Sequence, residues 1–307
     1  MALRLKKALL GGLLGMGLAA GPAQAVLMVT ALNPPALTAT DLANALLAGG
    51  GGITVHSATY VGANAASGLF SGGTGIIGFE SGILLTSGAV GNVVGPNNSG
   101  GTTANNGPLP GDPDLEGLIP AIQTTQDASV LTIVFTPTGG QVTFNYVFGS
   151  EEYNEFVNSG FNDVFGFFVN GVNAALIPGT ATPVSINNVN CGFAVGNNPA
   201  PGAGPNCGSY INNVNPTFAG LLDTELDGLT IVLPITAAVN AGVENTLKIA
   251  ISDVNDGNLD SAVFIQGGSF QVCGVAGAPP CPTVPEPGAL ALLSMGLLGL
   301  ALFRRRR

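Results

Sequence analysis

Apolar residues along most of this chain come in short runs, and glycine, asparagine or proline separates one run from the next. Runs of this length, rich in Val, Ile, Thr and Phe, are typical of β-strands. Asn170-Gly171 stands between two such runs and is a strong signal for a tight turn. The pattern predicts strands at residues 53–60, 82–86, 130–136, 141–148, 164–169, 230–235, 246–251 and 262–272.

A helix is expected only near the N-terminus. Thr38 and Asp41 have the spacing of a capping box, an apolar run follows at 42–48, and glycines at 49–52 end it. Many short antiparallel strands with long loops between them favour an all-β domain, a β-sandwich or jelly roll with this one short helix. The Gly-, Asn- and Pro-rich segments are expected to be long surface loops, at 91–113 and 195–208.

The first 25 residues have the pattern of a secretory signal peptide. Three basic residues precede an apolar stretch at 8–20, and Ala23-Gln24-Ala25 is a small-x-small cleavage site. We expect signal peptidase to cut after Ala25. Residues 1–25 are therefore excluded from the folded domain.

The C-terminus has the pattern of a second processed segment. The uncharged run at 288–303 is short for a permanent membrane span, and the arginines after it favour the cytoplasmic side. We predict a transmembrane sorting helix that holds the protein in the inner membrane until the tail is cut; an ordinary C-terminal anchor is the alternative. The residues that form the predicted sorting motif are Pro285, Glu286, Pro287, Arg304, Arg305, Arg306 and Arg307.

This tail resembles the PEP-CTERM sorting signal of Gram-negative bacteria. In proteins with that signal an exosortase, a membrane transpeptidase-like protease, processes the tail. The resemblance implies export with signal peptidase and exosortase as partners, transient anchoring in the inner membrane, and delivery to the cell surface or the extracellular space. The chain then divides into a signal peptide (1–25), a folded domain (26–274), a linker (275–283) and a sorting signal (284–307).

The folded domain is strongly acidic. The chain has 8 Lys and Arg against 18 Asp and Glu, but the two terminal signals contain every basic residue except Lys248. A net charge of about −17 remains between the signals. Such a domain repels nucleic acid and anionic lipid, because phosphate binding needs clustered Lys and Arg. It attracts divalent cations.

Four cysteines lie in the exported part of the chain. An even number in an oxidising compartment predicts disulfides. Proximity in sequence favours Cys191–Cys207, which closes a loop, and Cys273–Cys281, which holds the end of the domain before the tail. A zinc site is the weaker alternative, because it needs closer spacing of Cys or His.

Two acidic clusters border predicted strands. Glu151, Glu152 and Asp163 belong to the first, and the second is Asp253, Asp256 and Asp260. The segments around them resemble the choice-of-anchor L family of bacterial surface proteins, in which one domain is attached to varied C-terminal anchors. The resemblance covers most of the chain from Asp41 to Val272 and implies no molecular activity. The matching segments are 82–88, 147–156, 161–168, 211–215 and 260–265.

The acidic clusters suggest calcium as the one candidate cofactor. Ca²⁺ takes six to eight oxygen ligands from carboxylates and carbonyls, often on loops. We hypothesise one Ca²⁺ site to which six residues contribute. In the alternative interpretation Asp253 and Asp256 form turns and the glutamates are solvated, and the segment does not fit an EF-hand loop. The six candidate ligands are Glu151, Glu152, Asp163, Asp253, Asp256 and Asp260.

Signals for catalysis are weak. Glu151 and Glu152 resemble the carboxylate pair of a glycosidase, but neighbours in a strand point to opposite faces. His56, in an alternating strand, is expected to be a surface or hydrogen-bonded residue, and the chain contains no Gly-x-Ser-x-Gly nucleophile motif. We therefore expect that the protein is not an enzyme.

The sequence favours an exported surface or matrix protein with a structural or adhesive role in biofilm or exopolysaccharide. That role follows from the proteins that share this sorting signal and not from any single residue. A Ca²⁺-dependent carbohydrate-binding module is the alternative, with extracellular polysaccharide as partner. The chain has no Trp and 4 Tyr, so aromatic platforms for sugar stacking are few.

Overall fold

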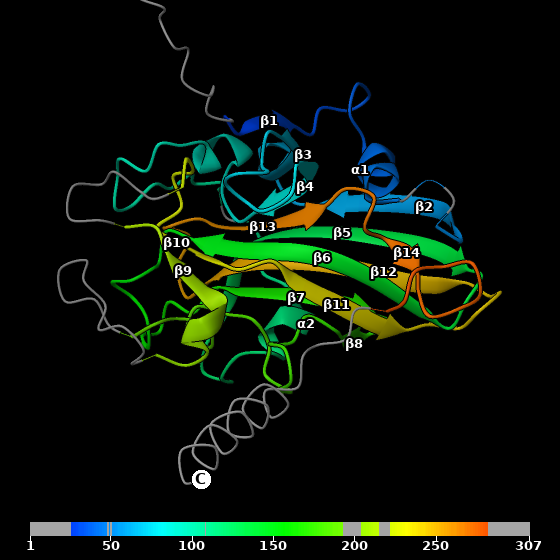
Figure 1. Cartoon of the computed structure of the whole chain (residues 1–307). Helices are drawn as coiled ribbons and strands as arrows, with labels where there is room; N and C mark the ends of the chain where they lie inside the picture. Colours follow the sequence, from blue (N-terminus) through cyan, green and yellow to red (C-terminus); the bar gives the residue numbers. More distant parts are fainter. Residues whose placement is uncertain are drawn as a thin grey trace, which may run out of the picture.

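The computed structural model describes residues 26–47, 49, 51–107, 109–192, 204–214 and 222–281. These residues form an all-β domain of two sheets (Figure 1). The larger sheet has nine strands in the described residues: β1 (Met28–Ala31), β3 (Ser67–Ser71), β4 (Ser81–Thr86), β13 (Ser261–Gln266), β6 (Gln141–Ser150), β10 (Gly228–Thr230) and β9 (Tyr210–Asn212) in order, with β11 (Leu233–Ala238) and β14 (Gln271–Val272) also paired to β6.

The smaller sheet has five strands within the described residues, in the order β2 (Ile53–Val61), β5 (Thr125–Pro137), β12 (Asn245–Val254), β7 (Val164–Val169) and β8 (Val172–Asn173). Neighbouring named strands in both sheets pair antiparallel. The remaining elements are α1 (Ala39–Leu46), α2 (Pro113–Glu116) and the 3-10 turns η1 (Asn64–Ala66), η2 (Val90–Val93) and η3 (Cys207–Ser209).

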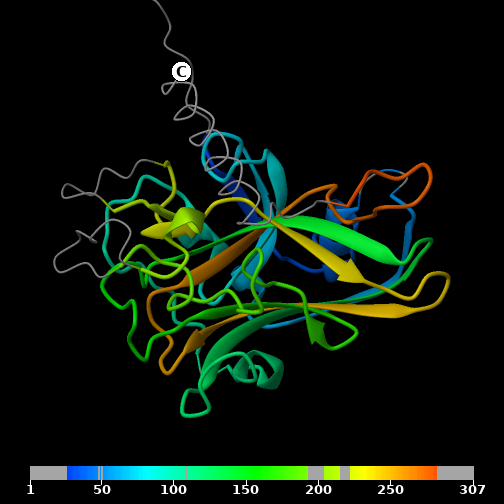
Figure 2. The same ribbon diagram turned by 60° about the horizontal axis from the view of Figure 1, so that its bottom comes forward.

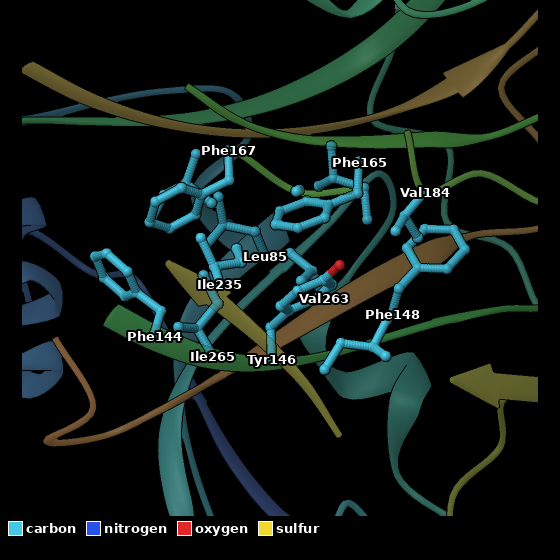
Figure 3. Close-up of a cluster of buried hydrophobic side chains, with 14 of the residues drawn as sticks. Leu85, Phe144, Tyr146, Phe148, Phe165, Phe167, Val184, Ile235, Val263 and Ile265 are labelled. Atoms are coloured by element: carbon cyan, nitrogen blue, oxygen red, sulfur yellow. The ribbon is translucent and has the colours of Figure 1, made fainter. Parts of the chain in front are cut away.

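The two sheets pack face to face through aromatic side chains. Phe144, Tyr146 and Phe148 alternate along β6 and therefore point to one face, toward β7 of the opposite sheet (Figure 3). The ring centroids of Phe144 and Phe167 lie 4.3 Å apart, which joins the sheets directly. Burying one such side chain contributes about 1.5–3 kcal/mol. The core between the sheets is thus the main source of stability.

A second apolar contact covers the outer face of the smaller sheet. Leu115 of α2 packs against Val164, Phe168 and Val254, and Figure 2 shows this helix beside the sheet. Asp112 caps α2, because its Oδ1 accepts hydrogen bonds from the main-chain N–H groups of Asp114 and Leu115. The sequence analysis did not predict this helix.

The predicted N-terminal helix is confirmed as α1. The main-chain N–H of Thr38 donates to Asp41 Oδ2 over 2.8 Å, and Thr38 Oγ1 accepts from the N–H of Asp41, which is the capping box. Leu42 and Leu46 are buried on the face that meets the core. The predicted tight turn is also present, with positive φ at both Asn170 and Gly171.

Most predicted strands are present, and the errors have local causes. The run predicted at 230–235 is divided between β10 and β11, because Ile231 and Val232 are exposed between them. The run at 262–272 is divided between β13 and β14 by a turn at Gly268, whose φ is 70°. The analysis missed the short strands β1, β3, β8 and β9.

Both predicted disulfides, Cys191–Cys207 and Cys273–Cys281, are present, so no thiol remains for the zinc alternative. No helix in the described part of the chain has the length and apolar character that a membrane span requires. The signal peptide, the predicted sorting helix, Pro285, Glu286, Pro287 and Arg304 to Arg307 lie outside the described residues.

Candidate functional site at the acidic end

Strand register brings acidic residues from both sheets to one end of the domain. In the larger sheet Ser150, the last residue of β6, pairs with the first residues of both β10 and β13. In the smaller sheet the start of β7 lies beside the end of β12. This end, where β9 and β10 are labelled in Figure 1, is called the acidic end here. Its buried acidic residues are Glu151, Glu152, Asp163, Glu225, Asp227, Asp253 and Asp260.

These seven residues are buried, each at most 5% exposed. Within the described ranges Lys248 is the one basic side chain apart from His56, and it contacts Asp112 and Asp114 near α2, at 2.6 and 2.7 Å. The acidic end therefore has no protein cation from these residues. A buried carboxylate without a cation must be hydrogen-bonded, protonated or neutralised by an ion.

A loop at 91–107 covers one part of the acidic end. Thr102 bridges two carboxylates, since its N–H donates to Glu151 Oε2 over 3.2 Å and its Oγ1 donates to Glu225 Oε1 over 2.8 Å. The N–H of Asn98 donates to the other oxygen of Glu225. Most described residues of this loop are exposed or half-buried, as predicted for a surface loop, while several of its main-chain and side-chain donors turn inward to the carboxylates.

Asp260 is held by the same loop. Its carboxylate accepts hydrogen bonds from the N–H of Ala104 and the amide of Asn92. Gly88 makes room for it, since a Cβ at this position would lie 1.7 Å from Asp260 Oδ2. Burial raises the pKa of Asp260, while the hydrogen bonds of the loop lower it.

Asn97 of the loop and Asp227 form a buried pair. Asn97 Nδ2 donates to Asp227 Oδ1 over 2.7 Å, and this leaves Asn97 Oδ1 and Asp227 Oδ2 without partners. Glu151 Oε1 is also buried and unpaired. Burial raises the pKa of Glu151 to about 10, with a further contribution from the charge of Asp227. Burial likewise raises the pKa of Asp227 to about 8.

A second group comprises Glu152, Asp163 and Asp253. Asp163 accepts hydrogen bonds from the N–H of Val254 over 3.0 Å and from Ser261 Oγ over 2.7 Å. Burial raises its pKa to about 7. Glu152 Oε2 and Asp253 Oδ1 are unpaired. Burial, and then the charge of Asp163, raises the pKa of Glu152 to about 10 and that of Asp253 well above its usual range.

The six predicted calcium ligands thus lie in different parts of the acidic end. Glu151 and Asp260 lie under the loop at 91–107, whereas Glu152, Asp163 and Asp253 form the second group. Asp256 is partly exposed and accepts from the N–H of Asn258, as expected of a turn former. No three Asp, Glu, His or Cys side chains among the described residues are arranged to hold a metal ion. Amide, carbonyl or water oxygens would have to complete any site.

The sequence analysis missed Asn97, Glu225 and Asp227. A signal was present, because Glu225 and Asp227 alternate immediately before a strand. Nothing in the local sequence places Asn97 near them, since that contact spans 130 residues. Glu151 and Glu152, which follow the end of β6, belong to different groups, so the pair does not converge as a glycosidase pair would. His56 is exposed and hydrogen-bonds Thr136 Oγ1 over 2.8 Å, which confirms its surface role.

Comparison with known proteins identifies two parts of the chain. Residues 31–271 match the family described as Choice-of-anchor L domain. Residues 283–307 match the PEP-CTERM protein-sorting motif. No curated protein and no solved structure matches the chain.

Proposed function

Because the chain belongs to the choice-of-anchor L domain family and ends in a PEP-CTERM motif, we propose that it has a structural or adhesive role in biofilm or exopolysaccharide. The motif marks an exported protein that an exosortase recognises and that reaches the surface of a Gram-negative cell. The observation that supports the role is the order of the two matches. The match to the domain ends at residue 271, and the sorting motif follows at residue 283.

The disulfides fit this destination. Disulfides persist in oxidising compartments such as the periplasm and the cell surface. Cys273–Cys281 ties the end of the domain two residues before the matched sorting motif begins. Processing of the tail would then leave the bond and the domain intact.

Export and processing are tested by recovering the protein from its host with and without the exosortase. Mass spectrometry of the surface, medium and inner-membrane fractions should find both termini cut and the processed form outside the cell. A Pro285→Ala, Glu286→Ala, Pro287→Ala variant should accumulate unprocessed in the inner membrane. Pro279→Ala with Pro280→Ala is the matched control. Recovery of the intact chain from the cytosol would contradict the proposal.

The structural role needs its own measurement. A strain that lacks the protein should form less biofilm and retain less exopolysaccharide, and the wild-type gene should restore both. Equal biofilm mass and polysaccharide in the deletion strain would contradict the role without affecting the conclusion on export.

The alternative function is a Ca²⁺-dependent carbohydrate-binding module. The excess of carboxylates in the domain supports it, because calcium can link carboxylates to sugar hydroxyls. Binding of the purified protein to host exopolysaccharide, measured with Ca²⁺ and with EGTA, separates the two. Retention that EGTA abolishes favours the module, and retention unchanged by EGTA favours the structural role.

A further inference from the structure

Three buried oxygens where the loop at 91–107 meets the acidic end have no hydrogen-bond partner among the described residues. They are Glu151 Oε1, Asp227 Oδ2 and Asn97 Oδ1, and all three residues are at least nine-tenths buried. An unsatisfied buried acceptor costs about 1–3 kcal/mol, and more when it is charged. Three unpaired oxygens in one place therefore indicate that a further group, such as a cation, compensates them.

The three side chains are neighbours. Asn97 and Asp227 share a hydrogen bond, so their two unpaired oxygens belong to one contact pair. Ser150 pairs with Gly228 in the antiparallel register of β6 and β10, so Glu151 and Asp227, the next residues beyond that pair, are brought opposite each other. The amide orientation of Asn97 is set by two acceptors, Asp227 Oδ1 and the carbonyl of Asn213, so its oxygen must face away from both.

The neighbouring carboxylates of Glu225 and Asp260 have no unpaired oxygen left for an ion. Both oxygens of Glu225 accept hydrogen bonds from Asn98 and Thr102, and both oxygens of Asp260 accept from Ala104. These two acids hold the loop. Glu151 and Asp227 each keep one oxygen that no donor of the described residues reaches.

We propose that Glu151 Oε1, Asp227 Oδ2 and Asn97 Oδ1 are ligands of one Ca²⁺ ion that fastens the loop at 91–107 to the acidic end. Two carboxylates balance the charge of one divalent cation. Ligands that are all oxygen, with an amide among them, suit Ca²⁺ better than zinc or copper. Water and main-chain carbonyls complete the coordination.

The second group is the weaker candidate for an ion. Asp163 is satisfied by Val254 and Ser261, so fewer oxygens remain for a metal. The proposal does not depend on the adhesive role, because an ion that fastens a loop acts on stability whatever the domain binds. Its failure would leave the conclusions on sorting and biofilm unchanged.

The test uses protein recovered from its host, stripped with EGTA and then titrated with Ca²⁺ by calorimetry. We expect about one equivalent, with a dissociation constant of about 10⁻⁴–10⁻³ M, as in extracellular calcium modules. Calcium at about 100 times that constant should raise Tm by roughly 5–10 °C. Hydrogen exchange of the loop at 91–107 should slow. If calorimetry detects no binding at Ca²⁺ concentrations up to about 100 times the expected dissociation constant, the proposal is overturned.

Variants locate the ion. Asp227→Asn and Glu151→Gln should each weaken Ca²⁺ binding by about tenfold or more. Asp253→Asn, an equally buried acid in the second group, is the matched control and should change binding less than threefold. If Asp253→Asn abolishes binding while Asp227→Asn does not, the assignment is wrong and the ion belongs to the second group.

A stability measurement separates loss of the ion from loss of the fold. In EGTA, Asp227→Asn should melt at the same temperature as wild type or higher, because an amide replaces an uncompensated buried carboxylate. Added Ca²⁺ should then raise its Tm much less than that of wild type. A variant that is less stable in EGTA and still responds to Ca²⁺ overturns the proposal, as does wild-type protein that prefers Mg²⁺ to Ca²⁺.

Discussion

The interior between the sheets and the acidic end are buried to the same degree, yet they are stabilised differently. The interior places Phe144 and Phe167 in direct contact, and no charge lies among them. The acidic end buries seven carboxylates with no basic residue among its described neighbours. Apolar burial stabilises independently of pH and of bound cations, whereas a buried carboxylate is tolerated only when protons, donors or a cation compensate it. Burial alone is therefore no measure of stability here.

The largest expected effect is in the apolar interior. Phe144→Ala removes a ring that lies 4.3 Å from Phe167 and 4.2 Å from Phe270. We expect a loss of about 3–5 kcal/mol in the free energy of unfolding. Urea unfolding should give the same loss with Ca²⁺ and with EGTA. The exposed control Val243→Ala should change stability little. If the loss for Phe144→Ala depends on Ca²⁺, the apolar interior and the acidic end are not stabilised independently.

The two disulfides sharpen the comparison, because they lie at opposite ends of the domain. Cys273 hydrogen-bonds Gln141 at the start of β6, whereas Val189, near Cys191, accepts from Tyr153 beside the acidic end. Their sequence separations are 8 and 16. In the chain-entropy model, replacing either pair by serine costs about 2.5–3 kcal/mol. Only the loss of Cys191–Cys207 should also reduce the rise in Tm on addition of Ca²⁺. An equal rise in both variants would show that the acidic end does not depend on this disulfide.

The pH dependence should come from the acidic end. Burial raises the pKa of Asp163 from 3.8 to about 7, so the folded state holds a proton that the unfolded state releases. That stability is fully present below about pH 4 and is lost as pH rises through about 7. In EGTA, Asp163→Asn should remove on the order of 1–3 kcal/mol from the stability difference between pH 5 and pH 8, because it removes the carboxyl group that retains the proton. Thermal melting at pH 5 and pH 8 measures this.

Glu244→Gln is the control for that experiment. Glu244 is exposed and lies directly before the start of β12, whereas the acidic end lies at the end of that strand, so its replacement should leave the difference between pH 5 and pH 8 unchanged. A steeper loss of stability with pH in Asp163→Asn than in wild type would contradict the interpretation.

The smallest effect is expected at the ion pair of Lys248. This pair is partly exposed, with Lys248 between Asp112 and Asp114. Lys248→Met should cost about 1 kcal/mol or less, and added salt should reduce the difference. A double-mutant cycle with Asp114→Asn isolates the pair. A stability loss well above about 1 kcal/mol that salt does not reduce would show that Lys248 stabilises more carboxylates than Asp112 and Asp114.

Local patterns in the sequence were sufficient for much of the fold. An uninterrupted apolar run predicted β7 at its observed limits, and the Thr38–Asp41 spacing predicted α1. Each of these signals lies within a few consecutive residues. The nearby cysteines were predicted as pairs for the same reason. The short strands β1 and β9 were missed because three or four residues carry too little pattern.

The sequence by itself determined an acidic, exported β-domain with two disulfides and a sorting motif. Only the tertiary structure decided which acids meet. Glu151, Asp227 and Asn97 are separated by dozens of residues, and strand register with the fold of one loop brings them together. The physical reason is that a carboxylate acts on its neighbours over a few ångströms of space, and no local pattern records which distant residues those neighbours are.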